Sequence, residues 1–436
     1  MKTLSPFSDK WYFCRKERWW NQHNRRSSVA PFLLCSIILT SLFCLLTLYS
    51  TYYSCMGTII PLDDKHVLDQ NSTLLQHNNA NVGKDQRCDL FEGQWIPDLN
   101  ATSYTNYSCQ TIPESKKNCF KNGREYVDFL NWRWKPQDCD LPKFDPKRFM
   151  EIVKGKKLAF IGDSVARNQV ESLLCLLSKE GIPVVEFKDV DDRSRTWHFP
   201  NNNFTLMVLW TRFLVADEEI ITNGTNSGIF NLHLDKIKIE WANKITDMDF
   251  AIISDGHWFF RKLYLYHNGV VTGCVYCNEP NITEKGLSYA IGESFRTAFR
   301  YINSCKECKK GVTTLLRTFS PPHFEHGTWN DGGSCNRTSP HHQLDEKSME
   351  YILELRNVQF QEVERARMES FVKKKEDKRF EILDVTKAML MRPDGHPGAF
   401  WGNKWMKGYN DCVHWCLPGP VDFWNQLLMA ILQRNY

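Results

Sequence analysis

The stretch KLAFIGDSVARNQ, residues 157–169, predicts a short buried strand that turns sharply into a helix. Leu158–Ile161 is an apolar run of strand length, and the residues after the Gly-Asp-Ser tripeptide have helical apolar spacing. Ser164 is therefore expected at the strand-to-helix elbow. There, unpaired amide N–H groups and the positive end of the helix dipole can stabilise an oxyanion beside a nucleophilic hydroxyl. The alternative is that Asp163 or Ser164 only caps the helix.

Beyond this stretch, short apolar segments alternate with helical patterns. Strands are predicted at residues 158–161, 205–210, 250–254, 313–319 and 380–385, and helices at residues 165–178, 287–303, 346–374 and 421–433. This alternation predicts an α/β fold with a mostly parallel sheet and helices on both of its faces. Because active groups gather at the carboxyl ends of parallel strands, the loops after the strands are expected to meet on one rim. The candidate side chains there are Ser164, His257, His323, His326, Asn330, Asp394 and His396.

Residues 32–53, FLLCSIILTSLFCLLTLYSTYY, form an uncharged segment that is long enough to span a bilayer. Its length and its bulky end favour an uncleaved anchor over a cleaved signal peptide, and the other alternative is a buried core helix. Residues 1–31 carry seven basic and two acidic side chains. The positive-inside rule therefore predicts a cytosolic tail, a type II signal anchor and a lumenal body.

Cysteines and glycosylation motifs agree with this orientation. Twelve of the sixteen cysteines lie at or after residue 88, an even number that suits disulfide bonds in an oxidising compartment. Asn-X-Ser/Thr sequons occur only after the segment. They begin at Asn71, Asn100, Asn106, Asn203, Asn223, Asn281 and Asn336. A glycoprotein of the secretory pathway is predicted.

Composition divides the lumenal part into three regions. Residues 54–87 are polar and aperiodic and predict a stem, residues 88–142 predict a cysteine-rich segment stapled to the main body, and residues 143–436 predict the catalytic domain. After residue 31, the chain carries 48 of its 55 basic and 49 of its 51 acidic side chains. This nearly neutral body excludes a phosphate-tracking surface and hence a nucleic-acid partner. The fifteen tryptophans belong mostly to the core, although exposed ones suit stacking on sugars.

A serine hydroxyl becomes an effective nucleophile when a neighbouring base, itself oriented by a carboxylate, takes its proton. Asp411 and His414 are three residues apart, a spacing that brings the carboxylate within reach of the ring on a helical turn or a tight loop. Flanking cysteines would hold that loop rigid. The rival pair, Asp394 and His396, lies two residues apart among glycine and proline. We favour His414 as the base.

Two motifs carry a family resemblance. Residues 162–164, GDS, and residues 411–425, DCVHWCLPGPVDFWN, fit the signatures GDS and DCxHWCLPGxxDxWN without a departure. With the anchor, stem and cysteine-rich segment, they make the chain resemble the plant trichome birefringence-like family of polysaccharide O-acetyltransferases. The resemblance implies a three-layer α/β fold of the GDS-esterase type. It also implies a catalytic triad of Ser164, His414 and Asp411, without a cofactor.

The same resemblance implies four disulfide bonds, namely Cys88–Cys139, Cys109–Cys175, Cys119–Cys416 and Cys335–Cys412. The last two would clamp the loop from Asp411 to His414. Four cysteines remain as two CxxC pairs, Cys274 with Cys277 and Cys305 with Cys308. Their spacing could suit zinc, but an oxidising lumen favours disulfides, and no metal site is predicted.

Two stretches look similar to the subgroup that acetylates xyloglucan side chains, namely residues 121–145, KNGREYVDFLNWRWKPQDCDLPKFD, and residues 164–177, SVARNQVESLLCLL. The expected protein is a Golgi membrane enzyme that moves an acetyl group through an acetyl-Ser164 intermediate onto a polysaccharide hydroxyl. Its partners would be the polysaccharide acceptor and an acetyl donor, whose identity the sequence leaves open. Gly256, Asn168 and Asn330 are candidate oxyanion donors.

Three alternatives stay open at this point. The acceptor could be xylan, mannan or pectin, because family members with the same motifs act on these polysaccharides. Water could attack the intermediate instead, which would make the protein a carbohydrate acetylesterase. A non-catalytic protein that binds wall polysaccharide through its tryptophans and tyrosines is the third.

Overall fold

The computed structural model describes residues 88–105, 107–109, 116–343, 349–373, 378–402 and 408–435. The predicted tail, membrane segment and stem, residues 1–87, lie outside the described residues. Within the described ranges, no helix combines the length and the apolar character that crossing a bilayer requires.

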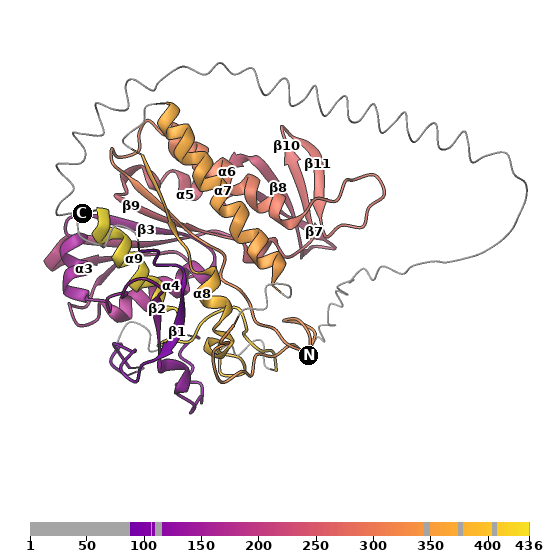
Figure 1. Ribbon diagram of the computed structural model, residues 1–436. Coiled ribbons are helices and arrows are strands. Elements are labelled where there is room, and N and C mark those ends of the chain that lie inside the picture. The colour runs from indigo at the N-terminus through magenta and orange to yellow at the C-terminus, as the bar shows by residue number, and fades with distance from the viewer. Residues whose placement is uncertain are drawn as a thin grey trace, which may run out of the picture. The chain divides into compact units, whose positions relative to one another are not determined.

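A seven-stranded sheet forms the centre of the body, with the strand order β13-β12-β9-β3-β6-β5-β4 (Figure 1). Its strands are β3 (Lys157–Gly162), β4 (Val184–Lys188), β5 (Arg195–Phe199), β6 (Phe204–Trp210), β9 (Phe250–Ser254), β12 (Thr313–Arg317) and β13 (Arg379–Leu383). The strands from β13 to β6 are parallel, which confirms the mostly parallel sheet. At the opposite edge, β5 and β4 run antiparallel, an addition that the sequence does not predict.

Side chains alternate between two cores along the central strands. On β3, Leu158 and Phe160 enter one core, while Ala159 and Ile161 enter the other. The first core lies under the helices α3 (Pro146–Ile152), α4 (Ser164–Leu176), α8 (Thr386–Leu390) and α9 (Asp422–Asn435). The second lies under α5 (Ile239–Ala242), α6 (Leu287–Ser304) and α7 (Glu350–Val372). Helices therefore cover both faces of the sheet, as predicted (Figure 1).

Several short 3-10 turns complete the helical elements. They are η2 (Asp128–Leu130), η3 (Pro200–Asn202), η4 (Ile245–Asp247), η5 (His257–Phe259) and η6 (Pro393–Gly395).

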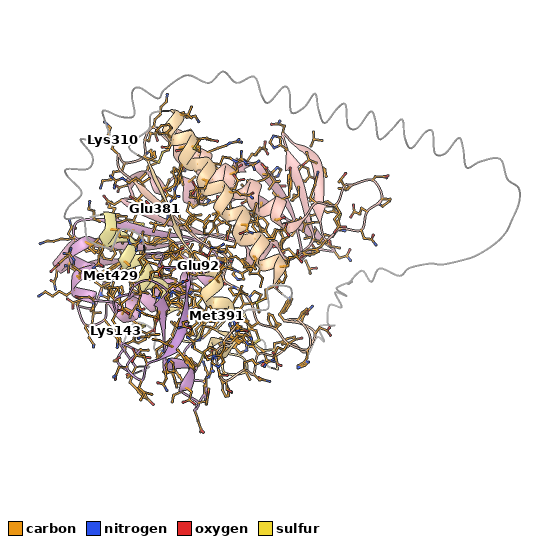
Figure 2. The ribbon with its side chains drawn as sticks, in the orientation of Figure 1. Glu92, Lys143, Lys310, Glu381, Met391 and Met429 are labelled. Atoms are coloured by element: carbon orange, nitrogen blue, oxygen red, sulfur yellow. A yellow bond between two sulfur atoms is a disulfide. The ribbon has the colours of Figure 1, made fainter. Side chains whose placement is uncertain are left out.

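Figure 2 shows side chains filling the space between the sheet and its helices. Met429 of α9, labelled there, accepts a hydrogen bond from the Asp145 N–H at 3.4 Å.

A second sheet of four strands, in the order β11-β10-β8-β7, packs over the core beneath α6. Its strands are β7 (Val215–Thr222), β8 (Thr225–Ile237), β10 (Leu263–His267) and β11 (Val270–Val275). No strand is predicted in these ranges from sequence. The strands are half-exposed, and register shifts interrupt the ladders of β7 and β10. A clean alternation of apolar and polar residues is therefore missing.

The cysteine-rich segment is joined to the body by aromatic packing and by disulfides. Its strands β1 (Gly93–Pro97) and β2 (Trp132–Pro136) pair antiparallel. Trp95 and Trp134 pack on Phe423 of α9, with ring centroids 5.2 and 5.6 Å away. The Trp95 indole N–H donates to the carbonyl oxygen of Ala388 at 2.8 Å. This packing places aromatic rings between the segment and α9.

All four disulfides implied by the family resemblance are present: Cys88–Cys139, Cys109–Cys175, Cys119–Cys416 and Cys335–Cys412. The second and third tie the cysteine-rich segment to α4 and to the loop before α9. Covalent ties of this kind stabilise a segment that is too short to bury a core of its own.

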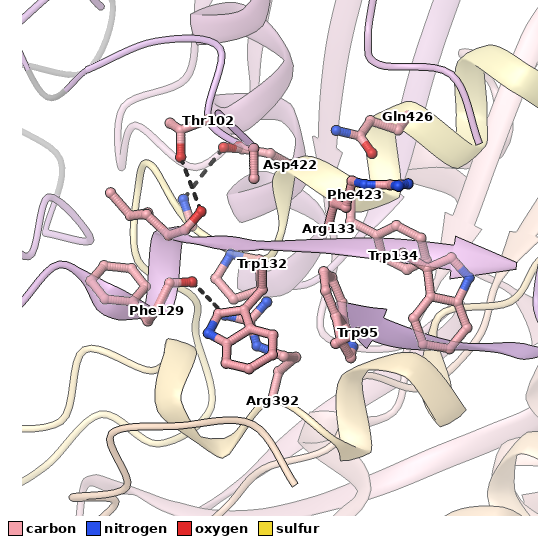
Figure 3. Close-up of a pocket in the computed structure, with 14 residues that line it drawn as sticks. Trp95, Thr102, Phe129, Trp132, Arg133, Trp134, Arg392, Asp422, Phe423 and Gln426 are labelled. Carbon is pink, nitrogen blue, oxygen red and sulfur yellow. Dashed lines mark hydrogen bonds between the residues drawn. The ribbon is translucent and has the colours of Figure 1, made fainter. Parts of the chain in front are cut away.

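A small pocket lies where the cysteine-rich segment meets the first turn of α9 (Figure 3). Trp132 and Arg133 of β2 line it together with Asp422 and Gln426 of α9. Arg392 stacks over the Trp95 ring at 4.5 Å at this pocket. Neither Ser164 nor His414 lines it, so it is separate from the site described below.

Gly162 provides a test of the tight contact between β3 and β9. Its φ is +151°, and a Cβ there would lie 1.8 Å from the carbonyl oxygen of Ser254. We expect Gly162→Ala to lower the free energy of unfolding by about 4 kcal/mol or more, because the main chain of Ser254 would have to shift to make room for the methyl group. Gly155, with φ +70° and open space around it, is the matched control. Gly155→Ala should cost only about 1–2 kcal/mol. Equal losses in urea unfolding would contradict this account of the elbow.

Candidate active site

Ser164 lies where the sequence predicts it, directly after the end of β3 and at the first position of α4. The preceding residue, Asp163, caps the helix, because its Oδ1 accepts a hydrogen bond from the Val165 N–H at 2.9 Å. The capping role therefore belongs to Asp163. As the first helical residue, Ser164 has an amide without an intrahelical acceptor, close to its own hydroxyl.

The Ser164 hydroxyl points at the His414 ring. Ser164 Oγ lies 2.8 Å from His414 Nε2, and His414 Nδ1 lies 2.9 Å from Asp411 Oδ2. With the Nδ1–H donated to the carboxylate, Nε2 is left to accept the serine proton. The His414 side chain is 21% exposed and the Asp411 side chain 6% exposed, so a substrate can approach the ring but not the carboxylate. The structure thus brings the three predicted side chains into one hydrogen-bonded chain.

The Asp411 carboxylate is held in its charged form. Burial would raise its pKa, but the His414 ring and two main-chain N–H groups, of Val413 and His414, outweigh burial and hold the pKa well below its usual range. The same main-chain contacts fold the loop around the carboxylate. Asp411 therefore both fixes the orientation of the ring and compensates a positive charge on it.

Two disulfides and one main-chain pair hold the loop that carries Asp411 and His414. Cys412 is bonded to Cys335, and Cys416 is bonded to Cys119. Asp411 also exchanges two main-chain hydrogen bonds of 2.9 Å with Gly398. The loop is thereby fixed at both ends, as proximity catalysis requires of a base.

Asn168 connects α4 to this loop. Its Oδ1 accepts from the Trp415 N–H at 2.7 Å, and its Nδ2 donates to the Trp415 carbonyl oxygen at 3.2 Å. The side chain is fully buried. Asn168 is therefore wrong as a candidate oxyanion donor, because its amide is already used to position the residue after His414.

Of the other two oxyanion candidates, Gly256 has its donor engaged, whereas the contact of Asn330 involves its acceptor oxygen. The Gly256 N–H donates to its neighbour Asp255 Oδ1 at 2.8 Å, so this amide is not free. Asn330 Oδ1 accepts a hydrogen bond from Thr328 Oγ1 at 2.9 Å within its own loop. The Ser164 amide at the start of α4 is the better donor for an oxyanion.

Asp163 has a second contact that the sequence does not predict. Its Oδ2 lies 3.2 Å from His257 Nδ1, and His257 Nε2 lies 2.9 Å from the Ser320 carbonyl oxygen. Burial would raise the Asp163 pKa, but His257, with help from the nearby Arg317, lowers it to about 2. His257 therefore links the loops after β9 and β12 to the elbow rather than serving as the base.

The rival pair, Asp394 and His396, does not form. The Asp394 carboxylate is fully buried in an ion pair with Arg392, at 2.8 Å from Nε. The His396 ring lies instead on Trp415, with ring centroids 4.0 Å apart, and its Nδ1 lies 2.7 Å from the His414 carbonyl oxygen. These residues support the loop from behind.

His323 extends this support. Its Nδ1 lies 2.7 Å from His396 Nε2, and its Nε2 donates to the Leu390 carbonyl oxygen at 3.1 Å. Burial lowers the pKa of His323 to about 4 and holds that of His396 well below its usual range. Both rings are therefore neutral at physiological pH. By contrast, His326 is exposed, with a φ of +60°.

Arg124 is a supporting residue that sequence reasoning missed. Its guanidinium donates to the carbonyl oxygens of His396 and Asp394 at 2.7 Å each. It also stacks over Phe129 at 4.0 Å. No local pattern marks this residue, because its partners lie about 270 positions further along the chain.

The two CxxC pairs each close on themselves, as Cys274–Cys277 and Cys305–Cys308. Both thiols of each pair are used, so neither pair offers thiolates to zinc. Among the residues that the structure describes, no group of three or more His, Cys, Asp or Glu side chains could hold a metal ion.

Family models match nearly the whole described body. Residues 141–431 match a GDSL/SGNH-like acyl-esterase family found in Pmr5 and Cas1p, and residues 86–140 match the PMR5 N terminal domain.

Individual relatives are similar over most of their length. Xyloglucan O-acetyltransferase 4 of Populus trichocarpa is 54% identical, over 96% of this chain and 95% of its own. Xyloglucan O-acetyltransferase 2 of Arabidopsis thaliana is 46% identical over the full length of both chains. Protein trichome birefringence-like 19 of Arabidopsis thaliana is 43% identical, over 87% of this chain and 91% of its own.

Asp422, in the long C-terminal motif, joins α9 to α4. It accepts hydrogen bonds from Ser172 Oγ at 2.5 Å and from Tyr104 Oη at 2.9 Å. Burial raises its pKa to about 7, and the hydrogen bonds only partly oppose this rise. The folded protein thus holds a proton on Asp422 that the unfolded chain, with a pKa of about 3.9, releases earlier.

This shift predicts how stability depends on pH. The contribution from Asp422 is complete below about pH 4 and is lost as pH rises through 7. The asparagine in Asp422→Asn resembles the protonated acid but does not titrate. We therefore expect the difference in the free energy of unfolding between acidic and alkaline pH to shrink by on the order of 2 kcal/mol. Unfolding at pH 5 and pH 8 measures it, with Asp138→Asn at an exposed position as control. An unchanged pH dependence in Asp422→Asn would refute the assignment.

Proposed function

The chain belongs to the GDSL/SGNH-like acyl-esterase family found in Pmr5 and Cas1p, in its trichome birefringence-like branch, and from this premise we propose that it acetylates xyloglucan. The observation that carries the proposal is the chain of hydrogen bonds from Ser164 through His414 to Asp411, of 2.8 and 2.9 Å. Relatives that are 54% and 46% identical and are named xyloglucan O-acetyltransferases support the choice of acceptor.

In the first half-reaction, Ser164 Oγ attacks the carbonyl carbon of the acetyl donor. His414 Nε2 takes the hydroxyl proton, and the Asp411 carboxylate compensates the positive charge on the ring. The Ser164 amide and the positive end of α4 stabilise the tetrahedral oxyanion. The proton on His414 passes to the leaving group as the carbon–leaving group bond breaks. An acetyl ester on Ser164 results.

In the second half-reaction, a sugar hydroxyl of the acceptor replaces the donor. His414 Nε2 takes the proton of that hydroxyl, and the sugar oxygen attacks the acetyl-Ser164 carbonyl. Collapse of the intermediate returns the proton to Ser164 Oγ and leaves the acetyl group on the sugar. Attack by water would give hydrolysis with the same residues, so exclusion of water distinguishes a transferase from an esterase.

We also propose that the protein acts in the Golgi lumen as a type II membrane protein. The apolar segment at residues 32–53 and the basic tail before it support this orientation. All twelve described cysteines are in disulfides, which suits an oxidising compartment. The described sequon asparagines are exposed and so accessible to glycosylation, namely Asn100, Asn203, Asn223, Asn281 and Asn336.

Ser164→Ala tests the mechanism. We expect the substitution to lower acetyl transfer to unacetylated xyloglucan by roughly 10⁴-fold or more, because no other group can carry the acetyl. Mass spectrometry of the polysaccharide measures the transfer. Ser304→Ala, at an exposed position at the end of α6, should transfer normally. Normal transfer by Ser164→Ala would refute the mechanism.

Isotope-labelled donor supplied without acceptor gives a second readout. The label should appear on Ser164 in the wild-type protein. Label on another residue would identify that residue as the nucleophile instead. Release of acetate from acetylated xyloglucan, without transfer to unacetylated chains, would favour the esterase. Transfer to xylan, mannan or pectin alone would keep the chemistry and change the acceptor.

A further inference from the structure

Two aromatic side chains lie side by side on the surface near the loop that carries Asp411. Trp329 is 49% exposed and Tyr409 is 42% exposed. Their ring centroids are 6.4 Å apart, and the ring planes are inclined by 39°. Large rings are normally buried for their apolar area, so two neighbouring exposed rings need a reason.

The segment that carries Tyr409 leads directly into the proposed active site. Tyr409 precedes Asp411 by two residues, so their Cα atoms lie within roughly 7 Å of each other along the chain. The Asp411 carboxylate contacts the His414 ring, which in turn contacts Ser164. Tyr409 therefore lies on the same short segment as the carboxylate that orients the proposed base.

The loop that carries Trp329 is tied to the same segment. Asn410 Nδ2 donates to the Gly333 carbonyl oxygen at 2.9 Å, and Cys335 is bonded to Cys412. Within the loop, the Gly333 N–H donates to the Thr328 carbonyl oxygen at 2.9 Å. The loops that carry the two rings are thus both tied to the segment that positions Asp411.

Tyr409 is also fixed from its own side. The Trp401 indole N–H donates to the Tyr409 carbonyl oxygen at 2.8 Å. On the other loop, Gly327 has a φ of +149°, and a Cβ there would lie 2.1 Å from the Asp331 carbonyl oxygen. This tight turn sets the direction of the residues that follow it. Because the main chain beneath both rings is held in place, little conformational freedom remains to be lost when a ligand binds.

We propose that Trp329 and Tyr409 form a stacking subsite for a sugar unit of the neutral acceptor polysaccharide, a proposal that rests on the proposed function. Sugar rings present flat C–H faces, which pack on exposed aromatic rings. Two rings are far too small for a stable protein interface, which buries about 1,200 Å² or more. The nearly neutral body agrees with a neutral ligand. The subsite positions the chain and is separate from the catalytic residues.

The test uses the purified full-length protein with Trp329→Ala and Tyr409→Ala. Each variant should raise the KM for xyloglucan about tenfold, as expected for the loss of one stacked ring. The rate at which labelled donor acetylates Ser164 without acceptor should be unchanged. Trp329→Phe should restore most of the affinity. Phe187→Ala, at a 45% exposed aromatic residue on β4, should change neither value.

Binding measurements separate the subsite from the chemistry. In the inactive Ser164→Ala protein, xyloglucan binding by affinity electrophoresis should weaken when Trp329 or Tyr409 is also replaced. If the wild-type protein transfers no acetyl group but this binding pattern holds, the proposed function fails and the subsite stands. Unchanged binding and an unchanged KM in correctly folded variants would overturn the subsite. It would also be overturned if Phe187→Ala weakened xyloglucan binding as much as Trp329→Ala or Tyr409→Ala does.

Discussion

The paired hydrogen bonds between Asn168 and the main chain of Trp415 hold the two halves of the site together. One partner lies on the helix that begins at Ser164, and the other directly follows His414, 247 positions along the chain from Asn168. Both contacts are buried, so loss of the side chain would leave two unpaired main-chain groups at a cost of about 1–3 kcal/mol each. The 2.8 Å contact between Ser164 and His414 depends on this connection. Disulfides, stacked histidines and Arg124 all support the same short loop from other directions.

Local patterns were sufficient to predict the parallel part of the central sheet and the position of Ser164. A strand that is buried on both faces must be apolar throughout, and Leu158–Ile161 shows this directly in the sequence. The Asp411 and His414 pair was also predictable, because both ends of the contact lie within one short loop. Their contact with Ser164 could not follow from spacing. It was inferred from chemical need and from the family motifs.

Other parts of the structure have no recognisable pattern in the local sequence. The strands β7 and β8 are half-exposed and irregular in register, so their pattern resembles that of a polar loop. Arg124 and His323 are single polar residues whose roles arise from distant partners. The position of Asn168 near the nucleophile in sequence suggests a chemical role, whereas its burial and its contacts give it a structural one. Proximity in sequence indicates what a side chain can reach, but its partners depend on tertiary packing.

The disulfide between Cys119 and Cys416 has a consequence for the order in which the protein matures. It joins residues that are 297 positions apart, from the cysteine-rich segment to the loop just before α9. Because a chain is made from its N-terminus, Ser164 is made 250 positions before His414. The proposed nucleophile is therefore without its base while those residues are being added. The bond between Cys119 and Cys416 can form only after His414 has also been made, so a chain that stops before His414 lacks both the base and this covalent tie.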